Sequence, residues 1–194
     1  MNNHSGKIRI ALIYGSTREG RFCDTVMNWV VAEINGRCDF ELELIDPATL
    51  DLPQRHLKEE SVAIIGLRHR LARADAFIVV TPEYNHSFSA PLKFLIDSAY
   101  SEWQAKPVAF VSYGGISGGL RAVEQLRLVF AELHTVTVRN SVSFANVWDK
   151  FDSNGNLRDP KAASKSLTTM LTKLEWWASA LRNARNELPY EQVA

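Results

Sequence analysis

Apolar residues gather in short runs along the chain, separated by longer stretches in which apolar and polar residues are mixed. Four runs are almost continuously apolar, which is typical of strands buried on both faces of a parallel sheet. A further run, Phe40–Ile45, alternates more but also has strand length. The continuous runs are Ile8–Tyr14, Ala76–Val80, Val108–Ser112 and Val136–Val138.

Between these runs, apolar residues recur every three or four positions, the spacing of one face of an α-helix. We expect helices at Asp24–Ile34, Ser61–Ala74, Ala90–Ala99 and Leu120–Leu133, and a last helix through Leu167, Leu171, Leu174, Ala178 and Leu181. Strands that alternate with helices predict an α/β fold, a doubly wound parallel sheet with right-handed crossovers.

Composition narrows the class of protein. A length of 194 residues with 46% hydrophobic content fits one well-filled core, so we expect a single domain over residues 1–194. Basic and acidic residues number 22 each, which argues against nucleic-acid and membrane-surface partners. The polar start and the lack of a membrane-length apolar run predict a cytoplasmic protein. Cys23 and Cys38 lack CxxC spacing, so we expect neither a disulfide scaffold nor a metal site.

Three segments with distinctive chemistry each follow a predicted strand. The first, residues 15–21 (GSTREGR), leads into a helix, where free backbone amides and the helix dipole favour a phosphate. Ser16 and Thr17 add hydroxyl groups, and Arg18 adds a charged donor pair. The segment matches neither the Walker loop nor the GxGxxG fingerprint. Taken alone, it is explained equally well as an ordinary turn with an exposed arginine.

The second segment, Thr81–Ser87, follows the predicted strand Ala76–Val80. Tyr84 could pack near a flat heterocycle, and the Asn85 amide could meet its carbonyl and imide edges. Pro82 could also simply end the strand, and we interpret His86 as a surface loop residue.

The third segment, Tyr113–Gly119, has glycine at four of its last six positions. Glycine lets the backbone approach a ligand closely and leaves amides free to donate. A merely flexible loop would not explain why these glycines fall on the same edge of the sheet as the other two segments.

In open parallel sheets, ligands bind beyond the carboxyl ends of the strands where the strand order reverses, and flavodoxin, with the order 2-1-3-4-5, holds FMN there. In that order the strands before the three segments are neighbours, so the segments would converge on one crevice. A phosphate site beside two segments suited to a heterocycle implies a mononucleotide. We therefore expect a flavodoxin-like sheet of five parallel strands.

At these three segments the sequence resembles the NADPH-dependent FMN reductase family, which also includes quinone, azo-dye and chromate reductases. The similarity runs from about Lys7 to Phe144, and its most specific part is PEYN at 82–85, followed by Ser, Pro and Lys93. The resemblance implies a cofactor site whose phosphate is held by Ser16, Arg18 and the residues around Cys23 and Asp24. It further implies that the isoalloxazine meets Pro82, Glu83, Tyr84, Asn85, Tyr113, Gly114, Gly115 and Ser117.

Many relatives have serine or asparagine where this chain has Phe22, Cys23 and Asp24. An inward carboxylate would repel phosphate, so we interpret Asp24 as a helix N-terminal residue. Packing or a backbone contact is the preferred interpretation of Cys23, with a redox-active thiol as the alternative.

The resemblance implies FMN as cofactor, NADPH or NADH as co-substrate, a small-molecule electron acceptor and a homodimer or homotetramer. Because the cofactor carries the chemistry, no catalytic side chain is assigned. Arg21 could favour a 2′-phosphate, and Trp103 is either an interface anchor or a core residue. Two alternatives stay open: a non-enzymatic flavodoxin-like electron carrier, and a flavin-free binding domain that kept the fold.

Overall fold

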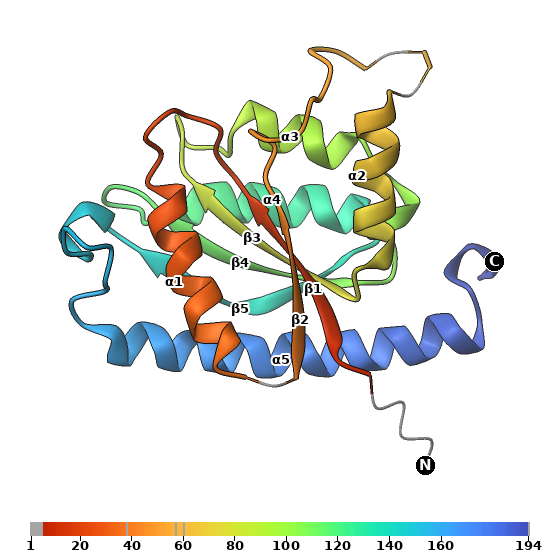
Figure 1. Ribbon diagram of the computed structural model, residues 1–194. Coiled ribbons are helices and arrows are strands. Elements are labelled where there is room, and N and C mark those ends of the chain that lie inside the picture. The colour runs from red at the N-terminus through yellow and green to blue at the C-terminus, as the bar shows by residue number, and fades with distance from the viewer. Residues whose placement is uncertain (1–5, 38, 57, 60, 194) are drawn as a thin grey trace.

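The computed structural model describes residues 6–193 except residues 38, 57 and 60, so Cys38 lies outside the described residues. Five parallel strands form one twisted sheet in the order β2-β1-β3-β4-β5 (Figure 1). The strands are β1 (Ile8–Tyr14), β2 (Phe40–Ile45), β3 (Ala76–Pro82), β4 (Pro107–Tyr113) and β5 (Val136–Phe144). The predicted flavodoxin-like class, strand number and strand order are confirmed.

Helices cover both faces of the sheet (Figure 1). On one face lie α1 (Cys23–Asn35) and α5 (Pro160–Glu187), whose apolar residues form one buried cluster with the strands. On the other lie α2 (Val62–Arg73), α3 (Ala90–Asp97) and α4 (Leu120–Glu132), which form a second cluster. Short 3₁₀ turns are η1 (Ser101–Trp103), η2 (Val147–Asp149) and η3 (Tyr190–Gln192). All five predicted helices are present.

Serines start two of the three helices on the second face, α2 and α3. The Ser61 hydroxyl accepts a hydrogen bond from the Ile64 amide, and the Ser89 hydroxyl accepts one from the Leu92 amide, as N-cap residues do. The Trp103 side chain is fully buried, and its indole donates to the Ile96 carbonyl at 3.0 Å. Trp103 is therefore a core residue and not an exposed interface anchor.

The last strand is longer than the apolar pattern predicts. The pattern ends at Val138, but β5 continues to Phe144 and pairs with β4 as far as Tyr113. β5 forms an edge of the sheet, so polar residues such as Arg139 and Ser143 can occupy it without being buried on both faces. The extension matters because it carries β5 to the edge where the three loops lie.

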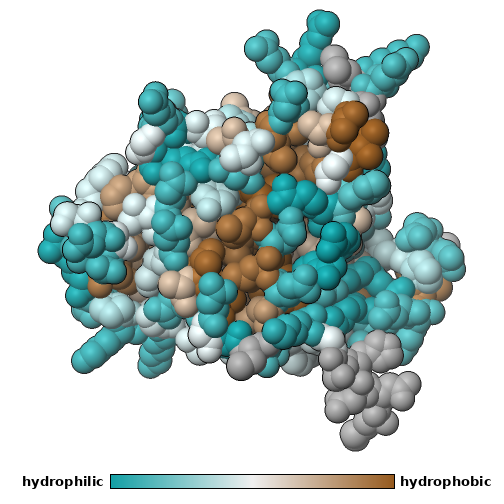
Figure 2. Space-filling view, in the orientation of Figure 1, coloured by the Kyte–Doolittle hydropathy of each residue, from teal (hydrophilic) through white to brown (hydrophobic). Residues whose placement is uncertain are grey.

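The other edge strand, β2, carries apolar surface. Figure 2 shows hydrophobic side chains over β2 and near the connection between β2 and α2, within a largely hydrophilic face. Leu44 of β2 is 44% exposed. Among the described residues, no helix combines the length and apolar character needed to cross a bilayer.

Candidate functional site

The first loop, residues 15–22, connects β1 to the start of α1. Gly15 lies so close to β3 that an added Cβ would come within 2.7 Å of the Val80 carbonyl oxygen, so this position needs glycine. The Ser89 hydroxyl donates to the Gly15 carbonyl at 2.7 Å and fixes the loop from the other side. The first-turn amides of α1 have no intrahelical acceptors. The loop and the helix start together offer the donors that a phosphate requires.

Arg21 holds this loop in shape. Its guanidinium donates to the Ser16 carbonyl, to Asp46 Oδ1 at 2.8 Å and to Asp24 Oδ1 at 2.9 Å. Burial alone would raise the pKa of Asp46, but the hydrogen bonds from Arg21 and from the Ala48 amide outweigh that effect and lower it. Arg21 and Asp24 form an ion pair, so the negative charge of Asp24 is offset. The Arg21 guanidinium is already paired with protein groups.

The second loop, residues 83–89, contacts the first through Tyr84. The Ser16 hydroxyl is fully buried and lies 2.8 Å from the Tyr84 hydroxyl. The guanidinium carbon of Arg18 lies 3.9 Å from the centre of the Tyr84 ring, a cation–π contact. Arg18 itself is exposed. Its charge is thus held at the protein surface beside Tyr84, where an anion could meet it.

A tight turn at Tyr84–Ser87 presents the Asn85 side chain to solvent. The Tyr84 and Ser87 backbones exchange two hydrogen bonds, at 2.8 and 3.0 Å. Between them, Asn85 and His86 have φ values of 50° and 67°, a conformation that is unfavourable for residues other than glycine. Gln125 of α4 stabilises the turn by donating to the His86 carbonyl at 2.8 Å.

The second loop also contacts the third, residues 114–119. Glu83 accepts hydrogen bonds from the Arg121 amide at 3.1 Å and from its guanidinium at 2.8 Å. Burial alone would raise the pKa of Glu83, but hydrogen bonds from Ser117 and Arg121 outweigh it and lower it. The Glu83 carboxylate is therefore ionised and ties the second loop to the third loop and to the start of α4.

The third loop is built to leave backbone donors open. Within the described part of the chain, the amides of Gly115, Ile116 and Ser117 have no hydrogen-bond acceptor. An added Cβ at Gly115 would meet no atom within 4 Å. By contrast, Gly118 has φ of 61°, and an added Cβ there would collide with the Ser143 hydroxyl. Gly118 shapes the loop, whereas Gly115 borders open space.

The side chains of Cys23 and Tyr113, two further predicted site residues, are buried as well. Cys23 is fully buried, and its thiol donates to the Val80 carbonyl at 3.5 Å. Burial raises the pKa of this thiol to about 11. Tyr113 is 4% exposed. Burial likewise raises the pKa of its phenol, which lies beside Cys23. Any contact of these residues with a ligand in the crevice has to come from the backbone.

The structure therefore joins three loops at the carboxyl ends of β1, β3 and β4, as the sequence predicts. It brings Ser16, Arg18 and Tyr84 together on one side and Glu83, Ser117 and Gly114 together on the other. Pro82 is the buried last residue of β3, and Gly114 is held by the Phe144 carbonyl at 3.1 Å. Fold and loops define a flavodoxin-like α/β protein whose three loops meet at the switch point of the sheet, where ligands of this fold class bind.

Comparison with known proteins identifies the family. Residues 8–149 match the model of the NADPH-dependent FMN reductase family, and the chain belongs to that family. It is thus an oxidoreductase that uses FMN together with NADPH or NADH.

Several curated relatives agree with this assignment. An NADPH:quinone oxidoreductase of Arabidopsis thaliana is 32% identical over 184 residues, which cover 87% of this chain and 90% of that protein. An NAD(P)H-dependent FMN reductase of Schizosaccharomyces pombe is 36% identical over 122 residues, but the match spans 57% of this chain and only 60% of the relative. Among solved structures, the flavoenzyme FerB, an NAD(P)H:(acceptor) oxidoreductase of Paracoccus denitrificans, shares the fold with a TM-score of 0.71 at 24% identity, covering 89% and 98% of the two chains.

Sequence reasoning missed the residues that support the loops from outside. Asp46 follows β2, and Arg121 and Gln125 lie one turn apart on α4. The spacing of Arg121 and Gln125 indicates a shared helix face. No local pattern, however, indicates that this face contacts the second loop. For Asp46, no sequence pattern indicates its pairing with Arg21.

Proposed function

We propose that the three loops bind FMN, with the phosphate at the first loop and the isoalloxazine between the second and third. The Ser16 loop, the amides at Cys23 and Asp24 and the Arg18 guanidinium would hold the phosphate. Pro82–Asn85 and the backbone from Tyr113 to Ser117 would contact the ring system. The residues fit the group, because the free amides of the third loop and the open space at Gly115 match a flat ring with carbonyl edges.

When bound, FMN supplies the redox chemistry by taking a hydride from a nicotinamide and giving an electron pair to an acceptor. The protein's part is to bind and orient. The amides of Gly115, Ile116 and Ser117 would donate to the ring's polar edge, where negative charge on reduction is stabilised by such donors. Glu83 and Gln125 keep the two ring-binding loops in position. No side chain is assigned as an acid or a base.

The single observation that carries this proposal is the direct bonding of the three loops to one another. The hydroxyls of Ser16 in the first loop and Tyr84 in the second lie 2.8 Å apart. Glu83 of the second loop accepts a hydrogen bond from Ser117 of the third and one at 2.8 Å from Arg121 at the start of α4. Absorbance spectroscopy tests it: FMN is added to the purified protein, and NADPH follows under anaerobic conditions. A shifted flavin spectrum that bleaches with NADPH is the expected result. No spectral change on adding FMN would refute the site.

The same experiment separates the electron-carrier alternative, for which FMN would bind but NADPH would not bleach it. Flavodoxin-like carriers are typically acidic, whereas this chain has 22 basic and 22 acidic residues. The neutral charge and the exposed Arg18 favour the reductase.

A small acceptor, such as the quinones named for several relatives, is the proposed oxidant. We further propose a cytoplasmic homodimer or homotetramer. In support, apolar residues are exposed beside the third loop: Ile116 at 85%, Leu120 at 49% and Trp148 at 63%. Trp148 is held there because the Val147 amide donates to the Gly114 carbonyl at 3.1 Å. Light scattering on wild type and Trp148→Glu tests this, and loss of the oligomer in the variant is expected.

A further inference from the structure

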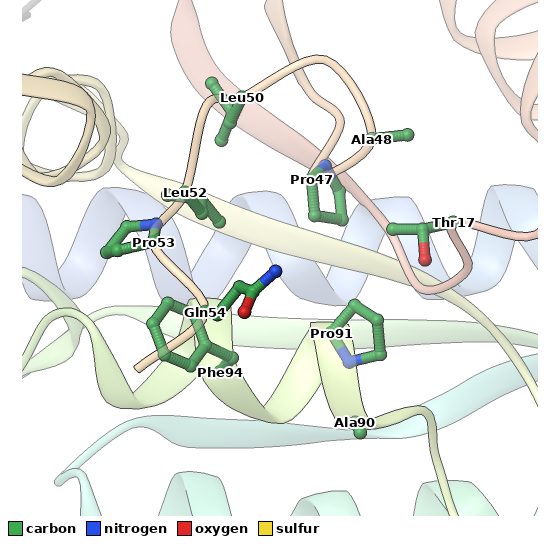
Figure 3. A pocket seen from close by; sticks show the side chains of 10 residues that line it. All are labelled: Thr17, Pro47, Ala48, Leu50, Leu52, Pro53, Gln54, Ala90, Pro91 and Phe94. Atoms are coloured by element: carbon green, nitrogen blue, oxygen red, sulfur yellow. The ribbon is translucent and has the colours of Figure 1, made fainter. Parts of the chain in front are cut away.

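A hollow of about 580 Å³ adjoins the first loop on the side away from the third loop. Its walls come from Thr17 of the first loop, from the β2–α2 connection and from the start of α3. Figure 3 shows the Pro47, Pro91 and Phe94 rings around it, with the Gln54 side chain extending from the connection toward the two prolines. This volume is within the range of small-molecule sites, roughly 300 to 1,000 Å³.

The lining of the hollow selects for a neutral, flat group. Among the described residues, no charged side chain lines it, and most of the lining residues are prolines, leucines, alanines and Phe94. Thr17 and Gln54 are the lining residues with polar side-chain groups. A glutamine amide can donate and accept at once, which suits a heterocycle that carries an amino group next to a ring nitrogen. A phosphate would find no counter-charge here.

Contacts within the protein support the outer wall at two points. Asp46, which starts the β2–α2 connection, is held by Arg21 at 2.8 Å and accepts from the Ala48 amide at 2.9 Å. At the α3 side, the His56 ring stacks on Phe94 with centroids 4.3 Å apart. Because these contacts restrain the wall, a ligand would lose less affinity to ordering it.

The position of the hollow relative to the proposed FMN site indicates what kind of ring would bind there. It shares Thr17 with the first loop, but no residue of Tyr84–Ser87 or Tyr113–Ser117 lines it. A ring that exchanges electrons with FMN has to contact the isoalloxazine, so a ring bound in the hollow is one that does not react. NAD(P)H is the substrate that carries a second, non-reacting ring. We propose that the hollow binds the adenine of NAD(P)H, an inference that rests on the proposed function.

Adenosine binding tests the proposal, because adenosine lacks the phosphate that the first loop could attract. The probe is titrated calorimetrically into the protein with and without saturating FMN. Ala48→Trp places an indole in the hollow from an exposed position, and Ala131→Trp, on the exposed face of α4, is the matched control. We expect Ala48→Trp to weaken adenosine binding and to raise the KM for NADPH, each by about 10-fold or more, which corresponds to roughly 1.4 kcal/mol. The control, the kcat at saturating NADPH and the Kd for FMN should stay unchanged.

Gln54→Ala, at an exposed position, keeps the test independent of any folding defect in the tryptophan variant. It should weaken adenosine binding by roughly 3-fold to 10-fold, the value of one hydrogen bond. If wild type does not bind adenosine, or if both variants bind it as wild type does, the proposal is wrong. A raised KM for p-benzoquinone with unchanged adenosine binding would assign the hollow to the acceptor and also overturn it. Failure of NADPH to reduce the flavin would instead count against the proposed function, and the adenosine titration would still decide the hollow.

Discussion

Gln125 on α4 makes two hydrogen bonds to the turn of the second loop. Its Nε2 donates to the His86 carbonyl at 2.8 Å, and its Oε1 accepts from the Ser87 hydroxyl at 2.6 Å. The turn needs such support because Asn85 and His86 both have positive φ, which costs free energy in residues with a Cβ. Gln125 is therefore a positioning residue for the loop that we propose binds the ring.

Replacing Gln125 by alanine should loosen the turn and weaken FMN binding by about 3-fold to 10-fold, since each net hydrogen bond is worth roughly 0.5 to 1.5 kcal/mol. The Kd follows from quenching of FMN fluorescence. Glu124→Ala changes the neighbouring, exposed residue and should leave the Kd unchanged. Equal FMN affinity in Gln125→Ala and wild type would show that the turn holds its shape unaided.

Gly115→Val should abolish most FMN binding while the thermal midpoint stays near that of wild type. An added Cβ meets no atom within 4 Å, and the valine side chain would enter the space assigned to the flavin. Gly118→Val is the contrasting variant, and it should lower the thermal midpoint because of its φ of 61° and the collision with Ser143. Calorimetry and flavin content measure both effects. Full flavin occupancy in Gly115→Val would contradict the position of the ring.

Arg18→Ala should weaken FMN binding by roughly 1.5 to 3 kcal/mol, or about 10-fold to 150-fold, through loss of a charge-assisted hydrogen bond to phosphate. Riboflavin, which has no phosphate, should bind both proteins alike. Glu19→Ala, at the next exposed position, serves as the control. If the variant loses as much affinity for riboflavin as for FMN, Arg18 acts through Tyr84 and not on the phosphate.

The ion pair between Arg21 and Asp46 should make stability depend on acid pH. The pKa of Asp46 is held below its usual value of 3.8 in the folded protein. The unfolded chain thus binds the proton more readily, and the pair's contribution is present above about pH 4 and lost as the pH falls through the folded pKa. Asp46→Asn should lower the denaturation midpoint at pH 7, and the difference from wild type should shrink in acid. Asp51→Asn, exposed in the same connection, should show no such trend.

The fold could be predicted where burial alone decides the residue type. Every residue of β3 and β4 is buried, so both strands stand out as apolar runs. The end of β5 could not be predicted in this way, because an edge strand exposes residues such as Arg139 to water. The end of β5 is a strand because it pairs with β4, which is a tertiary contact.

The loops of the site could be predicted because glycines and hydroxyl residues directly after a strand form a pattern within a short stretch of sequence. The contacts that hold those loops in place follow no such short-range pattern. Arg21 and Asp46 lie 25 residues apart, and His86 and Gln125 lie 39 residues apart. Such pairs depend on how whole helices and strands pack, which no short sequence window contains.

Cys23 lies fully buried at the start of α1, with its pKa raised to about 11 by burial. Quinones and similar acceptors are electrophiles that alkylate thiolates, and a thiol is attacked only in proportion to its ionised, accessible fraction. At neutral pH this thiol is protonated and covered by protein. If such acceptors bind at the nearby loops, the burial and protonation of Cys23 would protect this thiol from alkylation.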